Sequence, residues 1–393
     1  MPRSGDGNLP PAGDVYVGMK LSSFAAALVA PAVAAMAGAV VVTIPSTAAA
    51  APSTGHETTT RVDAITPGSY LTTVVRGPGT RDGGVRARSE RLLLVGPTGD
   101  SRTVYQRKVT RKAGSFMLAD WSADGRTALL LVGGMDGSQA IVVDVATGAA
   151  QELDVDRLSS AVLDPSGAGV IAAVWKGRRS NTQVLERISW TGAVAVLMER
   201  TNGSITPARD GTVLTQSVDR PHVQLLVSTT TGAVVSEFRH RGYCAPVRWW
   251  DATRLLETCG RNLYLVDPAT GRADRLTSGH GRGDYGHLDA RVVGSKVYVQ
   301  VAGACGYTYV AKITKNGSKH VRVPGAVGNV LMVTAVGDDL ILEHAASCDG
   351  SRPRSVLSRF DPVSHEETPL VTLRKHEAFG RIMLLGEVYA SQF

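Results

Sequence analysis

The sequence is poor in aromatic residues and in cysteine, and it lacks the short motifs that mark common catalytic sites. Phe, Trp and Tyr together make up 5% of the 393 residues, and only four cysteines are present. Because no two cysteines have C-x-x-C spacing, neither a zinc site nor a thioredoxin-like redox motif is expected. The absence of a G-x-S-x-G sequence excludes the nucleophile elbow of an α/β-hydrolase. We therefore assign no catalytic residue, no metal ligand and no cofactor.

The sequence also lacks a run of charges of one sign. Its formal net charge is +7, and the 42 Lys and Arg and 35 Asp and Glu residues are spread along the chain. A diffuse basic charge is compatible with binding to cell-wall polymers, lipid headgroups or nucleic acid, but solubility alone is the simpler explanation. We expect no nucleic-acid partner.

An apolar segment near the N-terminus stands apart from this composition. Lys20 precedes an almost uninterrupted run of Ala, Val, Leu and Met from Phe24 to Ile44, and a stretch of small residues reaches Ala51. This order is typical of a secretory signal peptide with a short N-terminal extension. The run is also long enough to span a bilayer, so an uncleaved membrane anchor is the alternative. We expect residues 1–51 to direct secretion or attachment to the cell envelope, and residues 52–68 to form a flexible linker.

Beyond the linker, one unit recurs along the chain. In its clearest copy, Asp124-Gly125 precedes an apolar run from Ala128 to Val132, and a second run from Ala140 to Val145 ends at Thr147-Gly148. Asp-Gly pairs favour two-residue hairpin loops, and short β-branched runs favour strands. The closing turn returns at intervals of roughly 40–50 residues, at Thr98-Gly99, Thr147-Gly148, Thr191-Gly192, Thr231-Gly232, Thr270-Gly271, Asn316-Gly317 and, in degenerate form, Pro362 to His365.

This period predicts a β-propeller. One unit presents two apolar faces that only neighbouring units can cover, and four short strands per unit form a propeller blade. We predict an all-β fold, a single propeller over residues 69–393 with seven blades of four antiparallel strands; six and eight blades are the alternatives. The first blade lacks an inner strand and the chain has a surplus one after Arg381. The C-terminal strand is therefore expected to join the first blade and close the ring.

The residues around the clearest copy carry a family resemblance. Trp121-Ser122-Ala123-Asp124-Gly125-Arg126 is similar to the W-S-P-D-G-[RK] signature of TolB-like β-propeller repeats. Leu163 to Gly167 resembles a degenerate copy of it, and Leu265 to Gly271 resembles the family's third-strand ending. The resemblance covers roughly Tyr70 to Phe393. It implies a WD-repeat-like propeller of a secreted bacterial type and specifies no activity.

Export makes the four cysteines candidates for disulfides. If Asp251-Ala252 is a two-residue loop, Cys244 and Cys259 lie opposite each other on paired strands, within reach of a disulfide. Cys305 and Cys348 occupy equivalent loops between the second and third strands of neighbouring blades, where a bridge would join the two blades.

Polar residues of the last four blades gather in the loops of one predicted face. This face carries the loops between second and third strands and the connections between blades, and propellers usually bind ligands there. Its glycines allow close approach of a ligand to the backbone. The candidate ligand-binding residues are His240, Tyr243, His280, Asp284, Tyr285, His287, Tyr307 and His344.

The predicted inner strands, which line the central channel, offer arginines instead of paired acids. These are Arg209, Arg248, Arg291 and Arg381. They favour a channel that tolerates anions, whereas glycosidases need two carboxylates at a defined separation. Trp249 and Trp250 end an inner strand and are expected to pack in the core.

Together these features predict a secreted, monomeric, non-enzymatic propeller that binds a protein, a peptide or a cell-envelope glycan. It would contact a membrane only through an uncleaved signal segment. The alternative is a hydrolase or lyase at the channel mouth, with His280, Asp284 or His287 as the acid–base group. A propeller can host either function, so the fold does not choose between them.

Overall fold

The computed structural model describes residues 65–77, 89–109, 114–134, 137–155, 157–177, 182–208, 210–240, 244–279, 284–303, 307–314, 317–345 and 354–387. The chain divides into two units, Met1–His56 and Glu57–Phe393, and every described residue belongs to the second. The expected signal peptide and most of the expected linker lie outside the described residues. Within the described ranges, no helix has the length and hydropathy needed to cross a membrane.

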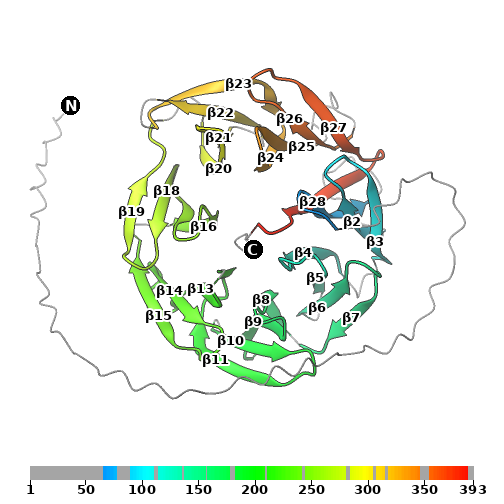
Figure 1. Ribbon diagram of the computed structural model, residues 1–393. Helices are drawn as coiled ribbons and strands as arrows, with labels where there is room; N and C mark the ends of the chain where they lie inside the picture. The colour runs from blue at the N-terminus through cyan, green and yellow to red at the C-terminus, as the bar shows by residue number, and fades with distance from the viewer. Residues whose placement is uncertain are drawn as a thin grey trace, which may run out of the picture. The chain divides into compact units, whose positions relative to one another are not determined.

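The described strands form seven four-stranded antiparallel sheets around a central axis (Figure 1), so the predicted seven-bladed propeller is confirmed. From inner to outer strand, the first three blades are β28 (Glu377–Leu384), β1 (Tyr70–Arg76), β2 (Ser89–Val95) and β3 (Ser101–Lys108); β4 (Phe116–Trp121), β5 (Thr127–Gly134), β6 (Gly137–Asp144) and β7 (Ala150–Leu153); and β8 (Leu158–Leu163), β9 (Gly169–Trp175), β10 (Gln183–Ser189) and β11 (Val194–Thr201).

The remaining four blades follow in chain order. They are β12 (Ile205–Pro207), β13 (Thr212–Gln216), β14 (Val223–Ser228) and β15 (Val234–Arg239); β16 (Cys244–Trp249), β17 (Leu255–Cys259), β18 (Asn262–Asp267) and β19 (Arg272–Arg275); β20 (Gly286–Val293), β21 (Lys296–Ala302), β22 (Thr308–Thr314) and β23 (Lys319–Gly328); and β24 (Val330–Val336), β25 (Asp339–His344), β26 (Val356–Phe360) and β27 (Glu367–Thr372).

The ring closes as predicted, by the last strand joining the first blade. β28 pairs with β1 in antiparallel register from Tyr70 opposite Leu384 to Arg76 opposite Glu377. Figure 1 shows the red β28 beside the blue strands of this blade. The pairing covers the inner edge of β1, which would otherwise be an exposed strand edge.

The Trp121 to Arg126 signature forms the turn between β4 and β5. The Trp121 indole N–H donates to the Gly125 carbonyl (2.8 Å), and the Asp124 carboxylate accepts the Arg126 N–H (3.0 Å). The two-residue loop predicted at Asp124-Gly125 is wrong, because the Ser122 N–H already donates to the Thr127 carbonyl and closes a longer turn. The hydrogen bonds from the Trp121 indole and to the Asp124 carboxylate stabilise that longer turn.

The core lies between neighbouring blades. One buried cluster joins Leu92 and Leu94 of the first blade to Leu118 and Leu130 of the second, and the other clusters follow the same plan. Burying one such leucine contributes about 1.5–3 kcal/mol. Each sheet therefore depends on both of its neighbours, as the repeat pattern predicts.

The turns between third and fourth strands also join blades. A Cβ added to Gly148, which follows β6, would meet the Val104 carbonyl oxygen of β3 at well under 3.0 Å. Gly232 makes an equivalent close approach to Leu197 of the outer strand β11, and Gly317 to Leu276, which directly follows the outer strand β19. In these closing turns the glycine is thus required by contact as well as by backbone conformation, whereas nothing lies within 4 Å of an added Cβ at Gly192.

Inner strands carry β-bulges that direct polar side chains toward the next blade. The register of β4 shifts just before Asp120, whose carboxylate accepts the N–H of Leu163 in β8 (2.8 Å). The register of β16 shifts just before Arg248, whose guanidinium donates to the carbonyl of Ala290 in β20. These side chains link blades around the channel.

Candidate functional site

Tyr243, His280, Cys305 and Cys348 lie outside the described residues, and the proposals made for them stay predictions. The other eight predicted site residues fall within the described ranges. They are His240, Asp284, Tyr285, His287, Tyr307, His344, Cys244 and Cys259.

The predicted disulfide of blade five is present. Cys244 and Cys259 face each other across β16 and β17, with an S–S distance of 2.03 Å and a Cα–Cα distance of 4.1 Å. The two-residue loop at Asp251-Ala252 is wrong, because Trp250 donates its N–H to the Arg254 carbonyl across a three-residue loop. The bulge before Arg248 compensates for the extra loop residue and restores the predicted cysteine pairing.

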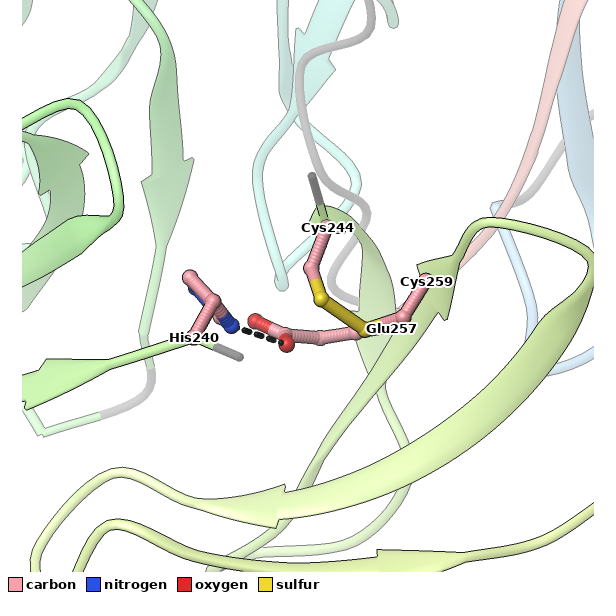
Figure 2. A group of neighbouring side chains, drawn as sticks. All are labelled: His240, Cys244, Glu257 and Cys259. Carbon is pink, nitrogen blue, oxygen red and sulfur yellow. Dashed lines mark ion pairs between the residues drawn. A yellow bond between two sulfur atoms is a disulfide. The ribbon is translucent and has the colours of Figure 1, made fainter. Parts of the chain in front are cut away.

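His240 lies beside this disulfide and is buried. Its Nδ1 is 3.0 Å from Oε2 of Glu257, and the two residues are 9% and 0% exposed. The donor atoms of these two residues and of both cysteines all lie within 4.8 Å of one another (Figure 2). Sequence reasoning missed Glu257; its one signal was an acidic residue inside the otherwise apolar run that begins at Leu255.

Asp284 precedes β20, and His287, predicted in a loop, is the second residue of that strand; both are buried. The Tyr309 hydroxyl donates to Asp284 (2.9 Å), and the Thr277 hydroxyl lies 3.0 Å from Nδ1 of His287. The His287 and His320 rings meet edge to face at 4.6 Å. Burial lowers the pKa of His320, and the charge of Asp284 partly opposes that shift. The structure thus gathers two predicted residues, together with His320 and Tyr309, which sequence reasoning missed.

The remaining predicted residues divide by exposure. Tyr285 and Tyr307 are 65% and 41% exposed. They flank the end of β21, because the Tyr285 N–H donates to the Ala302 carbonyl and Tyr307 accepts from Gly303. His344 is buried, with its Nε2 3.0 Å from the Glu367 carboxylate. Of the described candidates, the two tyrosines are therefore available to a ligand without rearrangement.

A pocket of about 360 Å³ lies at the other end of the channel. The ends of β16, β20 and β24 and the segment that follows β28 line it, so it belongs to the face that carries the turns between first and second strands. Trp249 and Trp250, expected in the core, are half-buried in its wall. Trp249 also packs against the buried cluster between the fourth and fifth blades and Trp250 against that between the fifth and sixth, so the predicted packing is confirmed in part.

Two arginines of the inner strands meet at this pocket. Arg248 and Arg291 are 6% and 5% exposed, and Asp289 lies between them, 3.1 Å from Arg248 Nε and 3.2 Å from Arg291 Nη2. Arg291 Nη1 also pairs with Glu387, and the Arg248 guanidinium lies 5.4 Å from the ring centre of Trp250. The positive charges of the two arginines are balanced by the negative charges of Asp289 and Glu387.

The prediction of a channel lined by arginines holds for Arg248 and Arg291, and Arg381 reaches the next blade by donating to the Ala119 carbonyl (3.2 Å). Arg209 lies outside the described residues. Single acids also project from the inner strands, Asp120 from β4 and Asp289 from β20. Burial raises the pKa of Asp120 to about 6, against hydrogen bonds from two backbone N–H groups that lower it.

No protein-family model and no curated protein matches the chain. Similar solved structures include a prolyl endopeptidase (14% identity over 80% of this chain and 50% of that one, TM-score 0.49). They also include TolB from Acinetobacter baumannii (13%, 79% and 66%, TM-score 0.43) and the β-propeller domain of Cps50 (Swd1) from Myceliophteria thermophila (12%, 66% and 88%, TM-score 0.46). The chain spans about half the length of the prolyl endopeptidase. At these identities the likeness concerns the fold alone.

Proposed function

We propose that the protein is an exported, non-enzymatic binding propeller whose pocket beside Arg248 and Arg291 receives a carboxylate group of its ligand. Peptides and acidic cell-envelope glycans are the ligand classes that carry such a group. The observation that carries the proposal is the ion pair of Arg291 with Glu387, a carboxylate that the chain itself supplies at the pocket wall.

The geometry of Arg291 supports exchange of that carboxylate for one from a ligand. One guanidinium nitrogen donates to the Val333 carbonyl of the next blade, which holds the side chain in place, while the other pairs with Glu387. A planar guanidinium binds carboxylates with defined orientation, and its attraction is stronger where water is excluded. Trp249 and Trp250 add the apolar and aromatic surface that small-molecule pockets usually have.

Two further observations support the assignment as an exported binding protein. The Cys244–Cys259 disulfide is of the kind that persists in oxidising compartments. Asp284 and His287, the described members of the alternative catalytic group, are buried and bonded to Tyr309 and Thr277. This burial supports binding over hydrolase or lyase chemistry.

The test compares arrays of peptides and glycans in matched forms. Peptides with free and amidated C-termini, and uronic-acid oligosaccharides beside neutral ones, are applied to wild type and to Arg291→Gln. We expect carboxylate forms to bind and their affinity to fall at least tenfold in Arg291→Gln. Arg272→Gln is the control, because Arg272 is exposed on the outer strand β19 and its loss changes the net charge equally.

Equal binding of the charged and neutral forms would contradict the proposal. Unchanged affinity in Arg291→Gln would do the same, provided that the variant unfolds as cooperatively as wild type. Weakening by both Arg→Gln variants would indicate attraction to net charge instead of a site.

A further inference from the structure

We propose that the reduced protein binds one zinc ion, or a divalent ion of similar preference, through His240, Cys244, Glu257 and Cys259. The disulfide then determines whether the site exists. This inference is independent of the carboxylate pocket, which lies at the opposite end of the channel.

The donor set has the composition and spacing of a tetrahedral site. Imidazole nitrogen, carboxylate oxygen and two thiolates are the ligands zinc takes in proteins, at about 2.0–2.3 Å, so that neighbouring donors stand roughly 3.3–3.8 Å apart. All four donor atoms already lie within 4.8 Å of one another, and His240 Nδ1 and Glu257 Oε2 are 3.0 Å apart. Figure 2 shows the imidazole of His240 and the carboxylate of Glu257 pointing toward each other, with the disulfide beside them. Once the S–S bond is broken, the sulfurs are free to separate to the required distance.

The burial of Glu257 and His240 is the second observation that points to an ion. A fully buried carboxylate is costly unless it is paired and hydrogen-bonded. The ion pair joins His240 Nδ1 to Glu257 Oε2. The other polar atom of each side chain, His240 Nε2 and Glu257 Oε1, has no hydrogen-bond partner among the described residues. A divalent ion between them would neutralise the carboxylate. Both cysteines are half-buried, so a reductant and an ion can approach from their side.

The chemistry balances with a small-molecule thiol as the reductant. Two thiol molecules reduce the disulfide: their sulfurs form one new disulfide, and Cys244 and Cys259 each gain one electron and one proton. Zinc then displaces both thiol protons into solvent, as thiolate ligation requires. His240 and Glu257 supply the other two ligands, and the proton shared between His240 Nδ1 and Glu257 Oε2 is displaced into solvent together with the thiol protons.

The test is a Co²⁺ titration of the full chain, reduced and then freed of reductant under anaerobic conditions. We expect one equivalent of Co²⁺ to bind with the thiolate-to-cobalt absorption of a tetrahedral site, and Zn²⁺ to displace it. The oxidised protein should bind none. The double variant Cys305→Ser, Cys348→Ser should behave as wild type, since it removes the remaining cysteines and keeps the proposed four ligands.

Glu257→Gln and Glu186→Gln form a matched pair. Glu186 is also a buried carboxylate with a basic partner, Lys176, but it lies in the third blade. We expect Glu257→Gln to weaken Co²⁺ binding at least tenfold and Glu186→Gln to leave it unchanged. Should Glu257→Gln fold poorly by circular dichroism, Cys259→Ser replaces it and must weaken the thiolate absorption. Co²⁺ binding without that absorption, equal binding by oxidised protein, or equal effects of the two Glu→Gln changes would overturn the proposal.

Discussion

Replacing Gly148 with alanine tests whether the closing turns hold neighbouring blades together. Gly148 has φ of +76°, and an added Cβ would press against the backbone carbonyl of Val104. Gly192 occupies the equivalent turn of the third blade with φ of +85°, but nothing lies within 4 Å of its added Cβ. The two glycines share the backbone requirement and differ in the contact between blades.

The expected magnitudes separate these two contributions. An alanine held at positive φ costs about 1–2 kcal/mol, and the reduced freedom of the unfolded chain offsets about 0.4–1 kcal/mol of it. Gly192→Ala should therefore lower the free energy of unfolding by about 1 kcal/mol. Gly148→Ala adds overpacking against β3, for which about 1–3 kcal/mol is typical. We expect Gly148→Ala to be the more destabilising variant by that additional amount.

Equilibrium unfolding in urea measures the difference. Tryptophan fluorescence can follow it, because Trp121 and Trp190 lie in the blades that carry the two glycines. The midpoints can be compared directly only if the dependence on urea is the same in both variants. Equal losses of stability in the two variants would refute the reasoning, because backbone conformation alone would then explain the recurring glycine.

Three further changes test individual groups, each by urea unfolding. Burial raises the pKa of Glu343 from 4.5 to about 8, so the stability that its protonated carboxyl contributes is fully present below pH 4.5 and is lost as pH rises toward 8. Glu343→Gln should remove this pH-dependent loss, which amounts to at most about 5 kcal/mol. Identical pH profiles of stability in wild type and variant would contradict the pKa shift. The double change Cys244→Ser, Cys259→Ser should cost about 3 kcal/mol under non-reducing conditions, and no loss would mean that the bridge is not formed in solution. Trp249→Phe removes the indole N–H bond to the Pro207 carbonyl of the preceding blade and should cost about 1 kcal/mol, with an unchanged midpoint counting against that link.

The fold could be predicted because the residues that specify it are local. Turn residues such as Asp124-Gly125 and Thr147-Gly148 mark the strand ends, and counting them yields the blade number and the surplus inner strand. Turn length was harder to predict, since it depends on side-chain bonds such as that of the Trp121 indole to Gly125. The Cys244–Cys259 pairing was predicted correctly although the loop was not, because an extra loop residue and a bulge compensate for each other.

The candidate site could be predicted only in part, because the direction of an inner-strand side chain depends on bulges. β-Bulges shift the strand register just before Arg248 and Asp289 and bring these two side chains together. The alternation of apolar and polar residues along a strand does not reveal where such bulges lie. Partners from distant segments, such as Glu257 for His240 and Glu387 for Arg291, have no signal in the local pattern. The prediction that these residues lie in accessible loops therefore failed for His287 and His344, which belong to β20 and β25 and are buried, whereas Tyr285 and Tyr307 are exposed.

The place of β28 in the first blade has a consequence for biogenesis. Six of the seven sheets are contiguous in the chain, and each can assemble as soon as its own four strands have been synthesised. The first sheet has to wait, because β1 receives its partner only after roughly 300 further residues, a separation whose closure in an unfolded chain costs about 5 kcal/mol. The other blades, once packed, bring the two strands close and lower that cost, so the seam forms last. Until then, β1 offers a bare edge to any neighbouring polypeptide, which makes the interval before completion the time of greatest danger from aggregation.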